Sequence, residues 1–105
     1  MRPPITQLLS QRPVIFDGAM GTELYNRNHF INICFEELSL TRPSVVKTIH
    51  EENKNAGCDV ITTNSFGANR YKLAEFLLAD RARAIAKGAA ELARSVAGED
   101  LYVAG

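Results

Sequence analysis

Two short segments of this chain combine small residues with polar side chains in a pattern that suits ligand binding. The first contains Asp17, Gly18, Ala19, Met20, Gly21 and Thr22, and the second runs from Thr63 and Asn64 to Asn69. Small residues let a ligand approach the backbone, whose N–H groups in a turn bind anions. The carboxylate of Asp17 could bind an ammonium group through a charge-assisted hydrogen bond.

A purely structural interpretation of the same residues stays open. Glycines often only form turns, and the side chains of Asp17, Asn64 and Asn69 could satisfy nearby backbone N–H groups. A phosphate-binding loop is less favoured, because neither the GxGxxG nor the GxxxxGK[ST] pattern occurs. Residue types and spacing alone do not choose between a turn and a binding loop.

Several other polar and aromatic residues have mainly structural interpretations. We expect His50 to pack or hydrogen-bond on a helix face, Glu36 and Glu37 to stabilise local structure or remain solvated, and Arg70 and Lys72 to be solvated rather than to contact an anionic donor. Phe66 and Tyr71 are interpreted as packing residues of the rim and of the following helix, with lining of the pocket as the less favoured alternative. Cys34 and Cys58 fit no zinc or redox spacing and are interpreted as small buried hydrophobes.

Composition argues against several classes of function. Twelve basic residues balance twelve acidic ones, so the chain lacks the net positive charge that attracts nucleic acid. No apolar run approaches the roughly 20 residues that span a bilayer, and the start has no apolar core of a secretory signal. Free thiols suit a reducing compartment. We expect a cytoplasmic protein without nucleic-acid or membrane partners.

The two candidate segments each follow a short β-prone run. Residues 14–16 are continuously apolar, which is typical of a strand buried on both faces. Residues 59–63 form the second run, and residues 101–104 form a third. These three runs are the predicted strands.

Helices are expected between these strands. A short helix is predicted over residues 6–11, and a longer one starts at Thr41 as N-cap, with Pro43 in its first turn. Gly57 is expected to close that helix in the left-handed conformation. Helical propensity continues over residues 70–96, with a break near residues 79–80 and an end at Gly98. The buried stripe of this last helix comprises Ile85, Ala89, Leu92, Ala93 and Val96.

One stretch has no clear pattern. Residues 23–40 contain Tyr25, Phe30, Ile31, Ile33 and Phe35, and these apolar side chains predict a packed excursion rather than a flexible linker.

The resulting order, β-α-β-α-β, predicts an α/β fold with parallel strands and right-handed crossovers. A complete (βα)8 TIM barrel has about 250 residues. We therefore expect residues 1–105 to be the N-terminal portion of such a barrel, truncated after the third strand. In this fold the loops that follow the strands gather on one face, where ligands bind.

Several segments together resemble the N-terminal part of the homocysteine S-methyltransferase family. They are residues 16–24 (FDGAMGTEL), 34–43 (CFEELSLTRP), 49–50 (IH), 56–57 (AG) and 63–70 (TNSFGANR). This domain occurs in cobalamin-dependent methionine synthase and betaine–homocysteine methyltransferase. The sequences of these segments most resemble bacterial members that join this domain to a methylenetetrahydrofolate reductase, whose cofactor would be FAD.

The resemblance implies methyl transfer to the sulfur of homocysteine, which yields methionine. In the family, three cysteine thiolates hold a zinc ion (Zn) that binds this sulfur as a thiolate. The resemblance assigns the amino acid end of homocysteine to Asp17, Gly18, Ala19, Met20 and Gly21, with Thr63 and Asn64 on the same rim. Asp17 would bind the ammonium group, and the amides of Gly18 to Gly21 would bind the carboxylate.

The chain departs from the complete family in one respect. The zinc cysteines of the family belong to later strands, and neither Cys34 nor Cys58 matches them, so we assign no catalytic and no metal-binding residue here. We expect a partial homocysteine-binding domain that is inactive by itself, and the sequence indicates neither the methyl donor nor the oligomeric state. Two alternatives stay open: a small α/β module that binds an anion through residues 18–21, and a piece that acts only by assembling with the missing part.

Overall fold

A computed structural model describes residues 2–27 and 33–105 of the chain. The helices are α1 (Ile5–Gln11), α2 (Met20–Asn26), α3 (Leu38–Thr41), α4 (Pro43–Ala56), α5 (Arg70–Leu73) and α6 (Ala82–Ala97). Two single 3-10 turns, η1 (Ala74–Phe76) and η2 (Ala79–Arg81), lie between α5 and α6, and the strands are β1 (Val60–Thr62) and β2 (Tyr102–Ala104). Within the excursion predicted over residues 23–40, Phe30 and Ile31 lie outside the described residues.

The two strands form a small parallel sheet. Val60 is paired with Tyr102, Ile61 with Val103 and Thr62 with Ala104. In sequence, β1 and β2 are separated by α5 and α6, which is the β-α-β arrangement expected for parallel neighbours. The fold class is therefore α/β, as predicted.

The first predicted strand, residues 14–16, is only partly formed. Phe16 makes a single parallel bridge to Val60, and the Ile15 carbonyl accepts the N–H groups of Asp59 and Val60 at 2.8 and 3.2 Å. The prediction that this strand is buried on both faces is wrong for this chain, because Ile15 and Phe16 are each 57% exposed. The segment is an edge whose one strand neighbour within the described residues is β1.

An ion pair fixes the start of this edge segment. The Arg12 guanidinium makes two hydrogen bonds to the Asp59 carboxylate, at 2.7 and 2.8 Å. Asp59 also accepts the N–H of Ile15 at 2.9 Å. The guanidinium hydrogen bond lowers the pKa of Asp59 to about 2, and the Ile15 N–H adds to this effect.

The helices follow the predicted pattern with one correction. Thr41 is the last residue of α3 and not the N-cap of the next helix, because the preceding residues already form a helical turn and α4 starts at Pro43. Gly57 closes α4 with φ 104°, so the predicted left-handed end is confirmed. The predicted break in the helical stretch of residues 70–96 is also confirmed, since two 3-10 turns separate α5 from α6.

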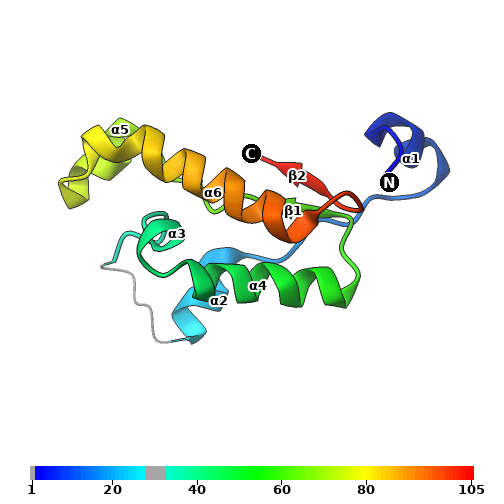
Figure 1. Cartoon of the computed structure of the whole chain (residues 1–105), viewed down its shortest axis with the longest axis horizontal. Coiled ribbons are helices and arrows are strands. Elements are labelled where there is room, and N and C mark those ends of the chain that lie inside the picture. Colours follow the sequence, from blue (N-terminus) through cyan, green and yellow to red (C-terminus); the bar gives the residue numbers. More distant parts are fainter. Residues whose placement is uncertain (1, 28–32) are drawn as a thin grey trace.

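Helices α4 and α6 lie side by side along the sheet (Figure 1). The core between α2, α3 and α4 contains Leu24, Leu38, Val46 and Ile49, and the core between α6 and the sheet contains Ile61, Ala93, Val96 and Ala97. Most of the predicted stripe of α6 is buried, with Leu92 half-buried. At Gly88 a Cβ atom would lie 2.5 Å from Cδ2 of Leu40, so α6 comes close to α3 there and a larger residue would have to displace the Leu40 side chain.

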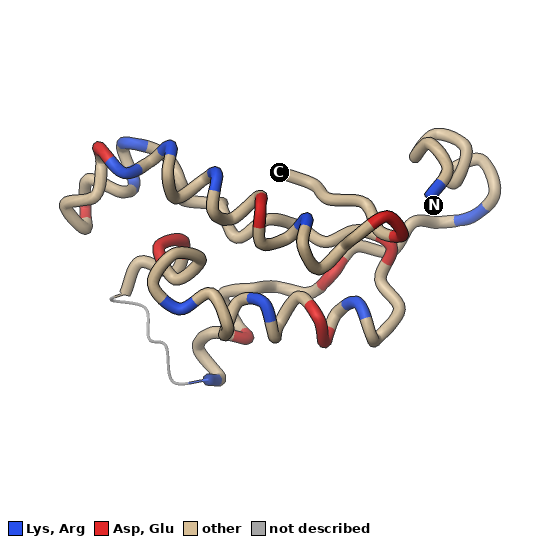
Figure 2. The backbone as a smooth tube through the Cα atoms, viewed as in Figure 1, with Lys and Arg blue, Asp and Glu red and all other residues tan. Residues whose placement is uncertain are grey.

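Charged positions of both signs are interspersed along the backbone (Figure 2). None of the helices in residues 2–27 and 33–105 combines the length and the apolar character of a membrane-spanning segment.

Candidate functional site

A cavity of about 470 Å³ lies where the edge segment and β1 end. All seven residues that the sequence assigned to a binding site line it: Asp17, Gly18, Ala19, Met20, Gly21, Thr63 and Asn64. The structure thus brings together two segments that are more than forty residues apart in the sequence. Parallel strands explain this proximity, because their carboxyl ends lie at the same edge of the sheet.

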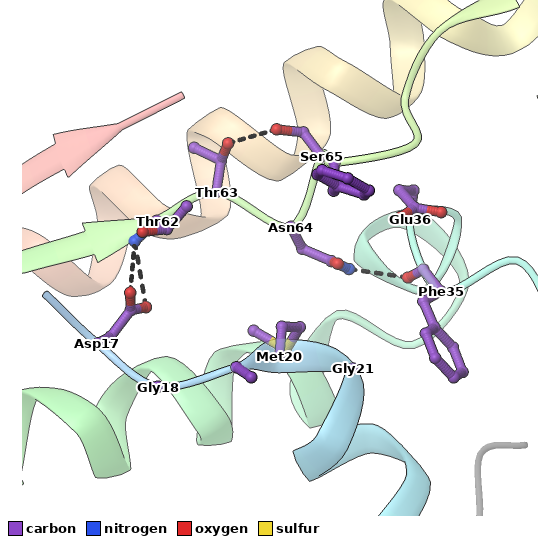
Figure 3. A pocket seen from close by; sticks show the side chains of 12 residues that line it. Asp17, Gly18, Met20, Gly21, Phe35, Glu36, Thr62, Thr63, Asn64 and Ser65 are labelled. Carbon is purple, nitrogen blue, oxygen red and sulfur yellow. Dashed lines mark hydrogen bonds between the residues drawn. The ribbon is translucent and has the colours of Figure 1, made fainter. Parts of the chain in front are cut away.

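Asp17 joins the two segments through its side chain. Both of its carboxylate oxygens accept the backbone N–H of Thr62, at 3.1 and 3.2 Å (Figure 3). The N–H of Asp17 donates to the Val60 carbonyl at 3.0 Å. The Thr62 N–H is the next donor along β1, and it is accepted by the Asp17 carboxylate instead of by a backbone carbonyl of the edge segment. A carboxylate has about four acceptor positions, and Asp17 therefore keeps capacity for a ligand while it holds β1.

The first segment is shorter as a loop than predicted. Met20 and Gly21 are the first residues of α2, so the loop comprises only residues 17–19. The N–H of Gly18 lies 3.5 Å from the side-chain oxygen of Asn53 on α4. Met20 packs against the core of α2, α3 and α4, and this anchoring starts the helix within the predicted loop.

Asn64 is buried and uses its side-chain amide inside the protein. Its Nδ2 donates to the Phe35 carbonyl at 2.8 Å and to the Ser39 hydroxyl at 3.2 Å. The two N–H bonds of the amide are therefore engaged, and a ligand could contact only its oxygen. The neighbouring Thr63 hydroxyl is 2.6 Å from that of Ser65.

Glu36 is a cavity residue that the sequence analysis did not assign to the site. Its Oε2 accepts the N–H of Gly67 at 3.1 Å, and its Oε1 lies 3.8 Å from the Cys34 sulfur. Burial raises the pKa of the Cys34 thiol, which therefore stays protonated and able to donate at neutral pH. The only signal in the sequence was the acidic pair, which does not distinguish Glu36 from Glu37.

The packing roles predicted for Phe66 and Tyr71 are wrong, because these side chains are 100% and 84% exposed. The less favoured alternative of pocket lining is confirmed for Phe66, which lines the cavity. The structural interpretation of Asn69 is confirmed, since its side chain accepts the N–H of Lys72 at 3.0 Å and caps α5. Arg70 and Lys72 are exposed, as expected for solvated residues.

His50 is fully buried on α4, which confirms its interpretation as a residue of the helix face. Among the described residues, neither of its ring nitrogens has a hydrogen-bond partner. Burial lowers the pKa of His50, and the negative charge of Asp17 partly opposes this shift. The imidazole is therefore neutral at pH 7.

The electrostatics of the cavity are negative. Its charged lining within the described residues consists of Asp17 and Glu36. A site lined by carboxylates favours a ligand with a positively charged group and disfavours a simple anion.

The chemistry of the present side chains does not fit a zinc site. Within residues 2–27 and 33–105, no three His, Cys, Asp or Glu side chains are grouped so that they could hold a metal ion. Burial raises the pKa of both Cys34 and Cys58, which disfavours the thiolate form that binds zinc. Cys34 is buried as predicted, and Cys58 is half-buried.

Comparison with known proteins gives consistent results. A sequence model described as homocysteine S-methyltransferase matches residues 14–105. The methionine synthase of Mycobacterium tuberculosis is 39% identical over 101 residues, which cover 90% of this chain and 8% of that protein. The methionine synthase of Mycobacterium leprae is 37% identical over 101 residues with the same coverage. The chain thus spans only a small part of the curated relatives that it matches.

Proposed function

This chain belongs to the homocysteine S-methyltransferase family, and on that premise we propose that it forms part of the homocysteine-binding domain of an enzyme that makes methionine. The complete enzyme transfers a methyl group from a small-molecule donor to the sulfur of homocysteine. In this proposal the present residues bind the amino acid end of the substrate.

One observation carries the proposal: the segments that begin at Asp17 and Thr63 line a single cavity. Its negative lining suits the ammonium group of an amino acid, for which Asp17 keeps acceptor capacity. The backbone of residues 18–21 lies in the same lining and would bind the substrate carboxylate. The alternative of a small anion-binding module is disfavoured, because Asp17 and Glu36 would repel an anion without a compensating positive group.

The sheet supports a position for this chain at the start of a barrel. Two parallel strands and an edge segment that exposes Ile15 and Phe16 suit the first part of a (βα)8 barrel, in which further strands would continue the sheet. We propose that residues 1–105 supply the first three strands.

The sulfur end of the substrate requires residues outside this chain. The present side chains do not fit zinc, so we derive no step through a metal here and place the ligands implied by the family resemblance in the remaining polypeptide. A reductase domain with FAD and a cytoplasmic location stay predictions of the sequence, which does not indicate the methyl donor.

Substitution of Asp17 in the complete enzyme tests the proposal. Asp17→Asn keeps an oxygen that can accept the Thr62 N–H but removes the charge, and Asp17→Ala removes both. A hydrogen bond to a charged group contributes about 1.5–3 kcal/mol, so we expect the KM for homocysteine to rise about tenfold or more in either variant. The KM for the methyl donor should change much less.

The matched control is Asp80→Asn, which removes an exposed carboxylate at η2 and should leave both KM values unchanged. Unchanged saturation by homocysteine in both Asp17 variants would remove this residue from the proposed role.

A further inference from the structure

The cavity has a third wall, which comes from neither of the two strand-end segments. This wall is residues 34–39, the part of the excursion that leads into α3, and it contributes Phe35 and Glu36 to the lining (Figure 3). Since the wall contacts both strand-end segments, it can set the distance between them.

On the first side the wall contacts α2 through an aromatic ring. A Cβ atom placed on Gly21 would lie 3.7 Å from the ring of Phe35, which is ordinary van der Waals distance. The Phe35 ring therefore lies directly against the start of α2. This contact is apolar and has no directional hydrogen bond.

On the second side the wall is held by hydrogen bonds at two points. Asn64 donates to the Phe35 carbonyl at 2.8 Å and to the Ser39 hydroxyl at 3.2 Å. Glu36 accepts the N–H of Gly67 at 3.1 Å, and the fit is close, because a Cβ atom on Gly67 would lie 3.3 Å from the carboxylate. Two hydrogen-bonded points that are three residues apart fix both the position and the direction of the loop that follows β1.

We propose that Glu36 and Asn64 are positioning residues of the homocysteine site, which together fix residues 34–39 against the loop after β1 and so set the width of the cavity. This inference rests on the proposed function and assigns Asn64 to the protein framework rather than to direct contact through its amide N–H groups. Loss of either side chain leaves the cavity wider and less well defined, so that homocysteine binds more weakly.

The role of Glu36 in this proposal depends on its ability to accept a hydrogen bond rather than on its charge. Glu36→Gln retains a side-chain oxygen that can accept the Gly67 N–H, whereas Glu36→Ala retains none. The adjacent Glu37→Ala is a matched control, because the Glu37 side chain does not line the cavity and makes no cap hydrogen bond to α3.

The experiment compares steady-state kinetics of the complete enzyme with these substitutions. We expect E36A to raise the KM for homocysteine about tenfold, with a smaller change in kcat and in the KM for the methyl donor. E36Q should recover most of that loss, and E37A should match the wild-type enzyme. N64A should shift the KM for homocysteine in the same direction as E36A, and if this buried substitution prevents folding, the Glu36 series decides alone.

Three results would overturn the inference. An E36A enzyme with the wild-type KM for homocysteine would show that the wall does not need the hydrogen bond between Glu36 and Gly67. An E36Q enzyme as impaired as E36A would show that the charge of Glu36 matters rather than its hydrogen bond. An effect of E37A equal to that of E36A would indicate a general loss of structure. Wild-type enzyme that does not methylate homocysteine would instead overturn the proposed function itself, which separates the two failures.

Discussion

The protonation of His50 depends on its burial more than on its residue type. The side chain is fully enclosed on α4, and no described residue pairs with either ring nitrogen. An unpaired polar group that is removed from water costs about 1–3 kcal/mol. Protonation would add the cost of a buried charge, which is why burial lowers the pKa of this histidine.

The shift predicts a loss of stability in mild acid. Because the folded-state pKa lies below the ordinary histidine value of 6.5, the unfolded chain binds a proton in a range of pH where the folded chain does not. The free energy of unfolding should therefore be highest above pH 6.5 and fall as the pH drops from 6.5 toward the folded-state pKa.

Replacement of His50 by Leu should flatten this slope, since the buried group no longer titrates. Chemical denaturation of the chain and of H50L at several pH values between 5 and 7.5 measures the effect. Equal slopes for the two proteins would show that His50 does not cause the pH dependence.

At the scale of residues, the sequence predicted the cavity lining better than the side-chain roles. Asp17 and Asn64 could be placed near each other because both follow β-prone runs. Their hydrogen bonds to Thr62, Phe35 and Ser39 depend on how distant segments pack, and no local pattern contains that information. The exposure of Phe66 was missed for the same reason, because aromatic residues are usually buried.

At the scale of elements, one ion pair connects the start of the edge segment to the residue before β1. Arg12 and Asp59 share two hydrogen bonds, and the N–H of Ile15 completes the group. The pair therefore aligns residues 14–16 beside β1, where an isolated bridge is the remaining strand contact.

This arrangement predicts a second loss of stability, which occurs below pH 4. The pKa of Asp59 is lowered from 3.8 to about 2, so its contribution to stability is present above pH 4 and is lost as the pH falls toward 2. Asp59→Asn should be less stable than the wild-type chain at pH 5, and this difference should shrink on acidification. Urea denaturation between pH 2 and 5 provides the measurement.

Arg12→Gln serves as the matched variant, because it removes the partner and keeps the carboxylate. It should reproduce the loss of stability seen in D59N. A stability difference for D59N that stays constant from pH 5 to pH 2 would contradict the proposed contribution of the ion pair.

Helices were easier to predict than the edge segment. The left-handed conformation of Gly57 follows from the conformational preference of glycine. The buried stripe of α6 follows from the helical spacing of its apolar residues. Thr41 was assigned to the wrong helix, since the turn that contains it forms from Leu38 onward and a good N-cap residue can also end a helix. The apolar run of residues 14–16 predicted a buried strand. Such burial requires neighbouring strands on both sides, and within the described residues this segment has one neighbour, β1.

At the scale of the whole molecule, the order of elements and the family were both accessible from the sequence. The segments around Asp17 and Asn64 indicated the family, and the family match over residues 14–105 confirms it. The barrel is a different matter, because two strands with one adjoining edge segment do not define a closed sheet. The barrel therefore stays a proposal, in which a further strand would pair with the exposed side of the segment that contains Phe16.

The last prediction concerns activity of the isolated chain. In the proposed function this chain binds only the amino acid end of homocysteine, and its described residues contain no group of side chains that could hold a metal ion. We therefore expect the 105-residue chain to form no methionine from homocysteine when it is supplied with zinc and with methyltetrahydrofolate or methylcobalamin. The complete enzyme assayed under the same conditions is the positive control. Methionine produced by the isolated chain, and lost on Asp17→Ala substitution, would contradict the assignment of the sulfur chemistry to other parts of the enzyme. Such a result would mean that the cavity between the Asp17 and Thr63 segments holds the whole substrate.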